Sequence, residues 1–104
     1  MASKLSRDQV ALRLDPIRDR ILGLGVRRLA LFGSIARNEG RRGSDVDLLV
    51  EFAPGEKSYD RLLDLADLLE ETLAAPVELV TIEGLSPHIG PHILAEATDV
   101  LRAA

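Results

Sequence analysis

The 104-residue chain has the length of one independently folding domain, and its 46% hydrophobic and 29% charged residues are typical of a soluble globular protein. It contains no cysteine, which excludes disulfides and thiolate metal sites. It also shows no signal peptide and no apolar run long enough to span a bilayer. We therefore expect a single domain over residues 1–104, in the cytoplasm and without membrane contact.

The net charge of −4 is unevenly distributed along the chain. Residues 1–43 carry ten Lys or Arg and four Asp or Glu, whereas residues 44–104 carry three and thirteen. This asymmetry indicates either a basic segment that faces an anion or ordinary solvated charge. The acidic total argues against direct binding to nucleic acid, which favours a strongly basic surface.

The first predicted element is helical. Ser6 and Gln9 have the spacing of a capping box, and four apolar residues follow at helical intervals: Val10, Leu14, Ile17 and Ile21. Pro16 interrupts this pattern, so the segment is either two short helices or one kinked helix. It should end at the glycines of residues 23–25.

Two strands with a short connection come next. Residues 26–32 are rich in Val, Leu and Ala and end at Gly33-Ser34, and residues 45–52 alternate apolar and polar side chains. Between them we expect a brief helix over residues 35–39 and a flexible basic loop over residues 40–43.

The second half of the chain predicts a helix, a strand and a further helix. Residues 58–73 have one apolar and one acidic face, residues 77–82 form a third strand, and residues 93–101 form a short helix, with an edge strand after it as an option. The predicted fold class is therefore α/β (α+β): a small mixed sheet of three to four strands with helices packed on it.

Asp45 and Asp47 are the residues most suggestive of chemistry. Two positions apart on a strand, their side chains point to the same face and their Cα atoms are about 6–7 Å apart. Carboxylates this close repel each other unless a cation or a proton lies between them. Mg²⁺ fits because it binds oxygen ligands and shares its coordination shell with substrate phosphates.

Gly33-Ser34 supplies the other half of the predicted site. Glycine permits close approach of the backbone, serine offers a hydroxyl, and the N-terminus of a following helix favours negative charge. Arg37 lies one helical turn later and can reach the same phosphates, as can Arg41 or Arg42 from the loop. Together these parts predict a site for a metal and a triphosphate.

The stretch LALFGSIARNEGRRGSDVDLLVEF, with Gly33-Ser34 ten residues before Ser44-Asp45-Val46-Asp47, resembles the signature of the polymerase-β-like nucleotidyltransferase superfamily. It is most similar to the minimal nucleotidyltransferase (MNT) branch, small prokaryotic domains that act as antitoxins beside an all-helical HEPN toxin. The resemblance extends over nearly the whole chain and implies the nucleotidyltransferase fold.

The resemblance also implies roles for individual residues. Asp45 and Asp47 would be paired metal ligands, and Glu78, in the strand PVELV, would be the third carboxylate, where the family more often has Asp. These three would be the catalytic residues and would hold two Mg²⁺ ions. Gly33, Ser34, Arg37 and Ser44 would bind the nucleotide, with ATP as the substrate.

The implied reaction is transfer of AMP from ATP to a hydroxyl, and the resemblance points to a tyrosine on a cognate HEPN ribonuclease toxin, which the modification would neutralise. Two alternatives remain: an antitoxin that neutralises its partner by binding alone, and a nucleotide-sensing module. A homodimer or heteromer is compatible with a domain of this size.

Three further features have simpler interpretations. His88 and His92 have helical metal-site spacing, but Gly90 and Pro91 between them favour an exposed loop. Glu51 shares the parity of Asp47 but lies about 13 Å along the strand, so we expect a solvated residue. The acidic side of residues 58–73 is either a solvated face or a surface for a basic partner.

Overall fold

The computed structural model describes residues 5–41 and 43–103. Helix α1 (Arg7–Leu14) begins at Ser6, whose hydroxyl accepts from the Gln9 amide while the Gln9 side chain accepts from the Ser6 amide. The capping box is therefore confirmed. Pro16 lies in the 3₁₀ turn η1 (Asp15–Ile17), which separates α1 from α2 (Arg18–Gly23). The segment thus forms two short helices.

Four strands form a single mixed sheet in the order β3-β2-β1-β4. Strand β1 (Val26–Phe32) is antiparallel to both β2 (Val46–Phe52) and β4 (Thr98–Arg102). Strand β3 (Val77–Thr81) is parallel to β2, and helix α4 (Tyr59–Leu73) connects the two. Parallel neighbours require such a crossover, because a tight turn can only join antiparallel strands. The predicted mixed sheet with packed helices is confirmed.

The structure corrects the last predicted helix. Residues 93–101 are divided between helix α5 (Gly90–Glu96) and strand β4, which begins two residues after α5 ends. Pro91 stands at the start of α5, where its missing N–H leaves no intrahelical bond unmade, so it begins a helix rather than preventing one. Pairing with β1 then draws the following residues into an edge strand.

Three other boundaries differ by a few residues. Strand β2 begins at Val46, so Asp45 immediately precedes it rather than forming its first residue. Strand β3 ends at Thr81 and is followed by the 3₁₀ turn η2 (Ile82–Gly84), in which the Gly84 amide donates to the Thr81 hydroxyl. Helix α3 (Gly33–Ala36) begins two residues earlier than predicted, directly at the Gly-Ser turn.

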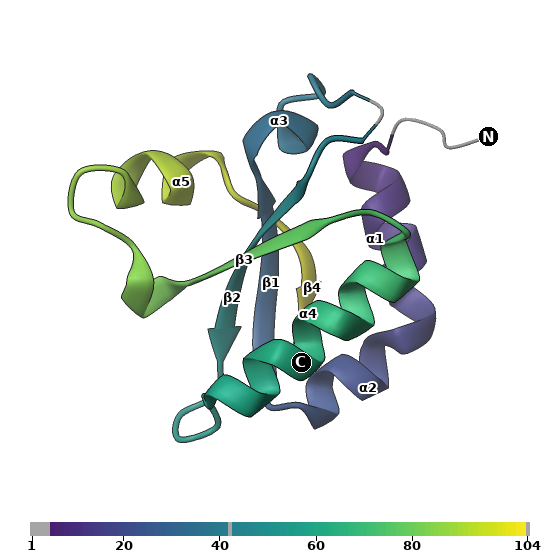
Figure 1. Cartoon of the computed structure of the whole chain (residues 1–104). Coiled ribbons are helices and arrows are strands. Elements are labelled where there is room, and N and C mark those ends of the chain that lie inside the picture. The colour runs from purple at the N-terminus through teal and green to yellow at the C-terminus, as the bar shows by residue number, and fades with distance from the viewer. Residues whose placement is uncertain (1–4, 42, 104) are drawn as a thin grey trace.

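The hydrophobic core lies between one face of the sheet and three helices. Figure 1 shows α1, α2 and α4 gathered together, away from α5. Alternate residues of β2 point toward these helices, which is the period-two pattern of a half-buried strand. The most deeply buried core side chains from the helices and the two central strands are Val10, Leu14, Ile21, Leu29, Leu31, Val46, Leu48, Val50, Leu65, Leu69 and Leu73.

The opposite face of the sheet carries the polar residues of interest. Phe32 pairs with Asp47, and Asp47 pairs with Glu78, so these three lie abreast across β1, β2 and β3. Residues directly paired in a ladder share one face, which is here the face turned away from the core helices. Within residues 5–41 and 43–103, no helix is both long and apolar enough to cross a membrane.

Candidate nucleotide site

The candidate site lies where β1 ends and where β2 and β3 begin. Because β1 is antiparallel to β2, its last residue, Phe32, comes beside Asp47 near the start of β2. Because β3 is parallel to β2, Glu78 near its start comes beside the same aspartate. Neighbouring strands are about 4.8 Å apart, so the sheet holds Asp47 and Glu78 at a fixed short separation.

Gly33 is packed directly against the Asp47 carboxylate. Its φ is +78°, a conformation that side chains other than glycine rarely adopt. A Cβ added here would lie 2.2 Å from Asp47 Oδ2, closer than any real contact. Glycine is therefore required at position 33 for two reasons: the left-handed backbone angle and the close approach of the backbone to a neighbouring group. That neighbouring group is a carboxylate of the candidate site itself.

The environment of Asp47 opposes its negative charge. Burial, together with the charge of Glu78, a hydrogen bond with Glu78 and the charge of Asp45, raises the pKa of Asp47 to about 6 from an ordinary value of 3.8. The Arg37 guanidinium acts in the opposite direction but does not compensate. A carboxylate that is destabilised in this way by like charges gains from a cation among them.

The three acidic residues form an open donor set. Asp45 and Glu78 are exposed and Asp47 is half-buried. Within residues 5–41 and 43–103, however, the structure brings no three His, Cys, Asp or Glu side chains into a group that could hold a metal ion, so the three-carboxylate metal site remains a prediction. Carboxylate oxygens on adjacent backbone positions nevertheless fit Mg²⁺, which keeps several waters and completes its shell with substrate phosphates rather than with a full set of protein ligands.

Arg37 and Gly33 share an anionic partner that the sequence did not indicate. The Gly33 amide donates to Glu96 Oε1 at 2.7 Å, and Arg37 Nη1 donates to the two oxygens of Glu96 at 3.2 and 3.1 Å. Glu96 is the last residue of α5, 63 positions from Gly33. No local pattern links positions so distant, and only the pairing of β4 with β1 brings Glu96 to the turn.

The remaining residues predicted to bind a nucleotide have different surroundings. Ser34 lies half-buried in the first turn of α3. The Ser44 hydroxyl accepts from the Arg41 amide at 2.8 Å and so closes the basic loop. Arg41 is exposed, and Arg42 lies outside the described residues. Ser44 therefore has a structural task in the loop, and its contact with a nucleotide stays a prediction.

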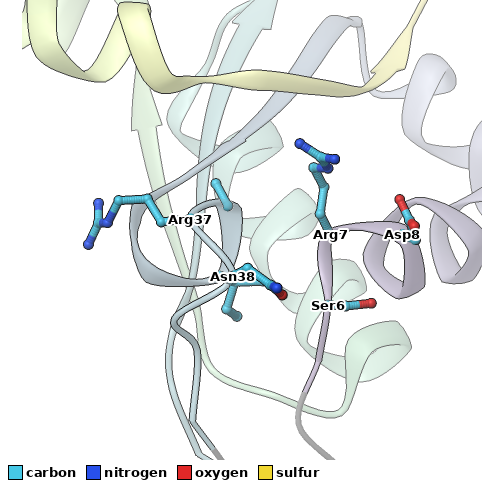
Figure 2. A pocket seen from close by; sticks show the side chains of 7 residues that line it. Ser6, Arg7, Asp8, Arg37 and Asn38 are labelled. Carbon is cyan, nitrogen blue, oxygen red and sulfur yellow. The ribbon is translucent and has the colours of Figure 1, made fainter.

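A polar pocket of roughly 300 Å³ lies beside α3. Figure 2 shows it between the start of α1 and the end of α3, with the Arg37 guanidinium pointing away from Arg7. Its lining residues are Ser6, Arg7, Asp8, Ile35, Ala36, Arg37 and Asn38. None of the three acidic site residues is among those that line this pocket.

Three other predictions concern residues outside the site. His88 and His92 are both exposed, and His88 precedes α5, so the two do not share a helix. Glu51 forms an ion pair with Arg27 at 3.5 Å. The acidic residues of α4 are exposed on the side away from the core: Asp60, Asp64, Asp67, Glu70 and Glu71.

Comparison with known proteins places this geometry in context. Residues 14–100 match the family model described as the nucleotidyltransferase domain. A Methanocaldococcus jannaschii protein, provisionally named as a protein adenylyltransferase, is 44% identical over 78% of this chain and 86% of its own length. The protein adenylyltransferase MntA of Thermococcus cleftensis is 37% identical over 73% of this chain and 76% of its own length.

Solved structures show the same architecture. One, provisionally described as a minimal nucleotidyltransferase, has a TM-score of 0.77 and 32% identity, and the similarity covers 90% of this chain and 95% of that one. A chain in the structure of a tri-AMPylated Shewanella oneidensis HEPN toxin in complex with an MNT antitoxin has a TM-score of 0.58 and 19% identity. The similarity covers 90% of this chain and 73% of that one. At that identity the second likeness establishes the fold alone.

Proposed function

Because the chain belongs to the nucleotidyltransferase domain family, we propose that it transfers AMP from ATP to a hydroxyl group. The observation that supports this best is the contact of the Asp47 carboxylate with Gly33 on one side and Glu78 on the other. It joins the two halves of the motif, a turn suited to phosphate and a set of carboxylates suited to a cation, within one small region of the sheet.

In this proposal Asp45, Asp47 and Glu78 hold Mg²⁺. When bound, magnesium ions would offset the negative charge of the triphosphate and the charge that develops on the leaving pyrophosphate. The raised pKa of Asp47 supports the assignment, because burial first, and then the charges of Glu78 and Asp45, disfavour its negative charge, and a cation held among these carboxylates would relieve that repulsion.

The protein residues would orient the nucleotide and remove a proton. Gly33, Ser34 and Arg37 bind the triphosphate through the Gly33 amide, the Ser34 hydroxyl and the Arg37 guanidinium. The acceptor oxygen attacks the α-phosphorus, the bond between the α-phosphorus and the bridging oxygen breaks, and pyrophosphate leaves. Glu78 is exposed at the edge of the donor set and takes the proton of the attacking hydroxyl.

We further propose that the acceptor is a tyrosine hydroxyl of a HEPN-type toxin. The support is twofold: relatives are named as protein adenylyltransferases, and a protein of the same fold was solved with a tri-AMPylated HEPN toxin. Two carboxylates of the proposed site, Asp45 and Glu78, are exposed, so a side chain presented by another protein can approach them.

A second candidate is neutralisation of the partner by binding alone. The exposed acidic row of α4, defined by Asp60, Asp64, Asp67, Glu70 and Glu71, favours it, because this row can face a basic surface without any nucleotide. The two candidates require different residues, so substitutions separate them.

The test uses the purified chain, the product of the adjacent gene, ATP and Mg²⁺. We expect the partner to gain the mass of one or more AMP units, and we expect Asp45→Ala and Asp47→Ala to abolish this gain. Asp19→Ala is the matched control, since it removes an exposed aspartate of α2 that lies outside both the site and the acidic row of α4, and it should leave transfer unchanged. Neutralisation that survives both site substitutions without any AMP transfer would favour the binding candidate.

A further inference from the structure

Glu96 occupies an anion-binding position within the candidate nucleotide site. One of its carboxylate oxygens accepts from the Gly33 amide at 2.7 Å, and Arg37 donates to both oxygens. The hydrogen bond from the Gly33 amide, followed by the bond and charge of Arg37, lowers the pKa of Glu96. The backbone turn and the arginine therefore already bind a negatively charged oxygen group in the free protein.

A carboxylate and a phosphate compete for the same donors. Both present oxygen acceptors with negative charge, and both pair with arginine in a two-point arrangement. A backbone amide has a single proton, so Gly33 cannot make a full-strength hydrogen bond to Glu96 and to a phosphate at the same time. The two anions would also repel each other at this distance.

We infer that Glu96 is an internal competitor of the nucleotide, whose phosphate displaces it from Gly33 and Arg37. This inference rests on the proposed function, since it takes the bound anion to be the phosphate chain of a nucleotide. The apparent affinity for ATP is then the intrinsic affinity multiplied by the fraction of molecules in which Glu96 has left the turn.

Glu96 is able to leave because other contacts hold its segment in place. Strand β4 pairs with β1, Leu101 is buried in the core, and Asp99 bonds to Arg28. At the start of α5, Gly90 is buried and packs against Leu85. The Glu96 side chain itself retains 32% of its exposure, so a rotation into solvent requires no opening of the core.

The contact also connects nucleotide binding to α5. Two apolar side chains at this helix are largely exposed to solvent. Ile89, at its N-cap, is 60% exposed, and Leu94, within it, is 48% exposed. When Glu96 is released, α5 loses its bonds to α3, while β4 stays attached to β1. Nucleotide binding should therefore loosen α5 specifically, and hydrogen exchange of residues 90–96 should rise on addition of ATP.

The test is the affinity of Glu96→Gln and Glu96→Ala for ATP with Mg²⁺, measured by calorimetry in the absence of an acceptor. Glutamine keeps the size of the side chain and removes its charge, so this variant remains informative even if Glu96→Ala destabilises α5. We expect the Kd to fall about three- to tenfold in both variants. Glu83→Gln is the matched control, because Glu83 is an exposed glutamate in an ion pair with Lys57, and its Kd should equal the wild-type value.

An unchanged or higher Kd in Glu96→Gln would overturn the inference, because a side chain that merely anchors α5 has no reason to oppose ATP. Inorganic pyrophosphate is the second probe and separates this result from failure of the proposed function. Tighter pyrophosphate binding by Glu96→Gln without AMP transfer by any variant would sustain the competitor and reject the transferase. AMP transfer by the wild type with no gain in affinity for either probe in Glu96→Gln would do the reverse.

Discussion

Gly33→Ala tests the link between the turn and the metal-binding carboxylates. An added Cβ would lie 2.2 Å from Asp47 Oδ2, about 1.2 Å inside the 3.4 Å at which ordinary contact begins. Asp47 Cγ and Cβ would also be close, at 3.1 and 3.3 Å, so a small rotation of the carboxylate alone does not remove the overlap. The aspartate must move by about 1 Å, and a displacement of this size at a reacting centre lowers the rate about 100-fold.

The chain contains a control with the same backbone strain and no overlap. Gly55 has φ +77°, against +78° for Gly33, and a Cβ there would meet nothing within 4 Å. Alanine in this left-handed conformation should cost about 1–2 kcal/mol at either position. The overlap should add about 1 kcal/mol at Gly33, at the low end for overpacking because Asp47 is only half-buried.

The assays are urea unfolding for stability and mass spectrometry of the partner for the initial rate of AMP transfer. We expect Gly55→Ala to lose stability but keep the wild-type rate, and Gly33→Ala to lose somewhat more stability and about 100-fold in rate. Equal rates for the two alanine variants would refute the reasoning, because the close approach of Gly33 to Asp47 would then have no bearing on the site.

Three further predictions concern the carboxylates. In metal-free buffer, Asp47 binds a proton more tightly in the folded state, with a pKa of about 6 against 3.8, so its contribution to stability falls as pH rises through this window. Asp47→Asn should therefore match the stability of the wild type near pH 4 and exceed it by about 1 kcal/mol above pH 6, after discounting for solvent screening. Urea unfolding in EDTA from about pH 4 to above pH 6 measures the difference in the free energy of unfolding between the two proteins. A difference that does not change with pH would contradict the prediction. Mg²⁺ should raise the Tm of the wild type but not that of Asp47→Asn, and an equal rise in both would place the ion elsewhere. Glu78→Gln should lower the rate of AMP transfer about 100-fold, whereas Glu78→Asp should recover part of it, since a carboxylate remains; initial rates at saturating ATP decide this, and a wild-type rate in Glu78→Gln would remove Glu78 from proton transfer.

Local signals in the sequence were sufficient for most of the fold. The side chain of Ser58 caps α4 where the acidic, amphipathic pattern begins, and Ser6 with Gln9 does the same for α1. Both caps depend on residues three positions apart, which a pattern can reveal. The alternation in β2 likewise predicted which of its side chains enter the core.

Interactions between distant segments were not predictable in this way. The division of residues 93–101 into a helix and a strand depends on β1 offering a free edge to Thr98–Arg102. Glu96 follows from the same event, since its contact with Gly33 exists only once β4 has paired. The sequence placed Asp47 and Gly33 in one site, but it contained no sign of the anion that already lies there.

Because β2 and β3 pair in parallel, the connection between them can change in sequence and length without moving the two carboxylates that the strands carry. Asp47 and Glu78 are neighbours through the ladder, while the chain between them passes through α4 on the far side of the sheet. Lengthening or exchanging the turn at residues 53–58 leaves the register unchanged, and doubling a flexible loop costs only about 0.6 kcal/mol. The exposed side of α4 is similarly free to diverge as long as its leucines remain and Glu70 keeps its hydrogen bond from the Val77 amide. Copies of such a domain can therefore acquire new binding specificities by changing this connection, while the positions of the two carboxylates are inherited intact.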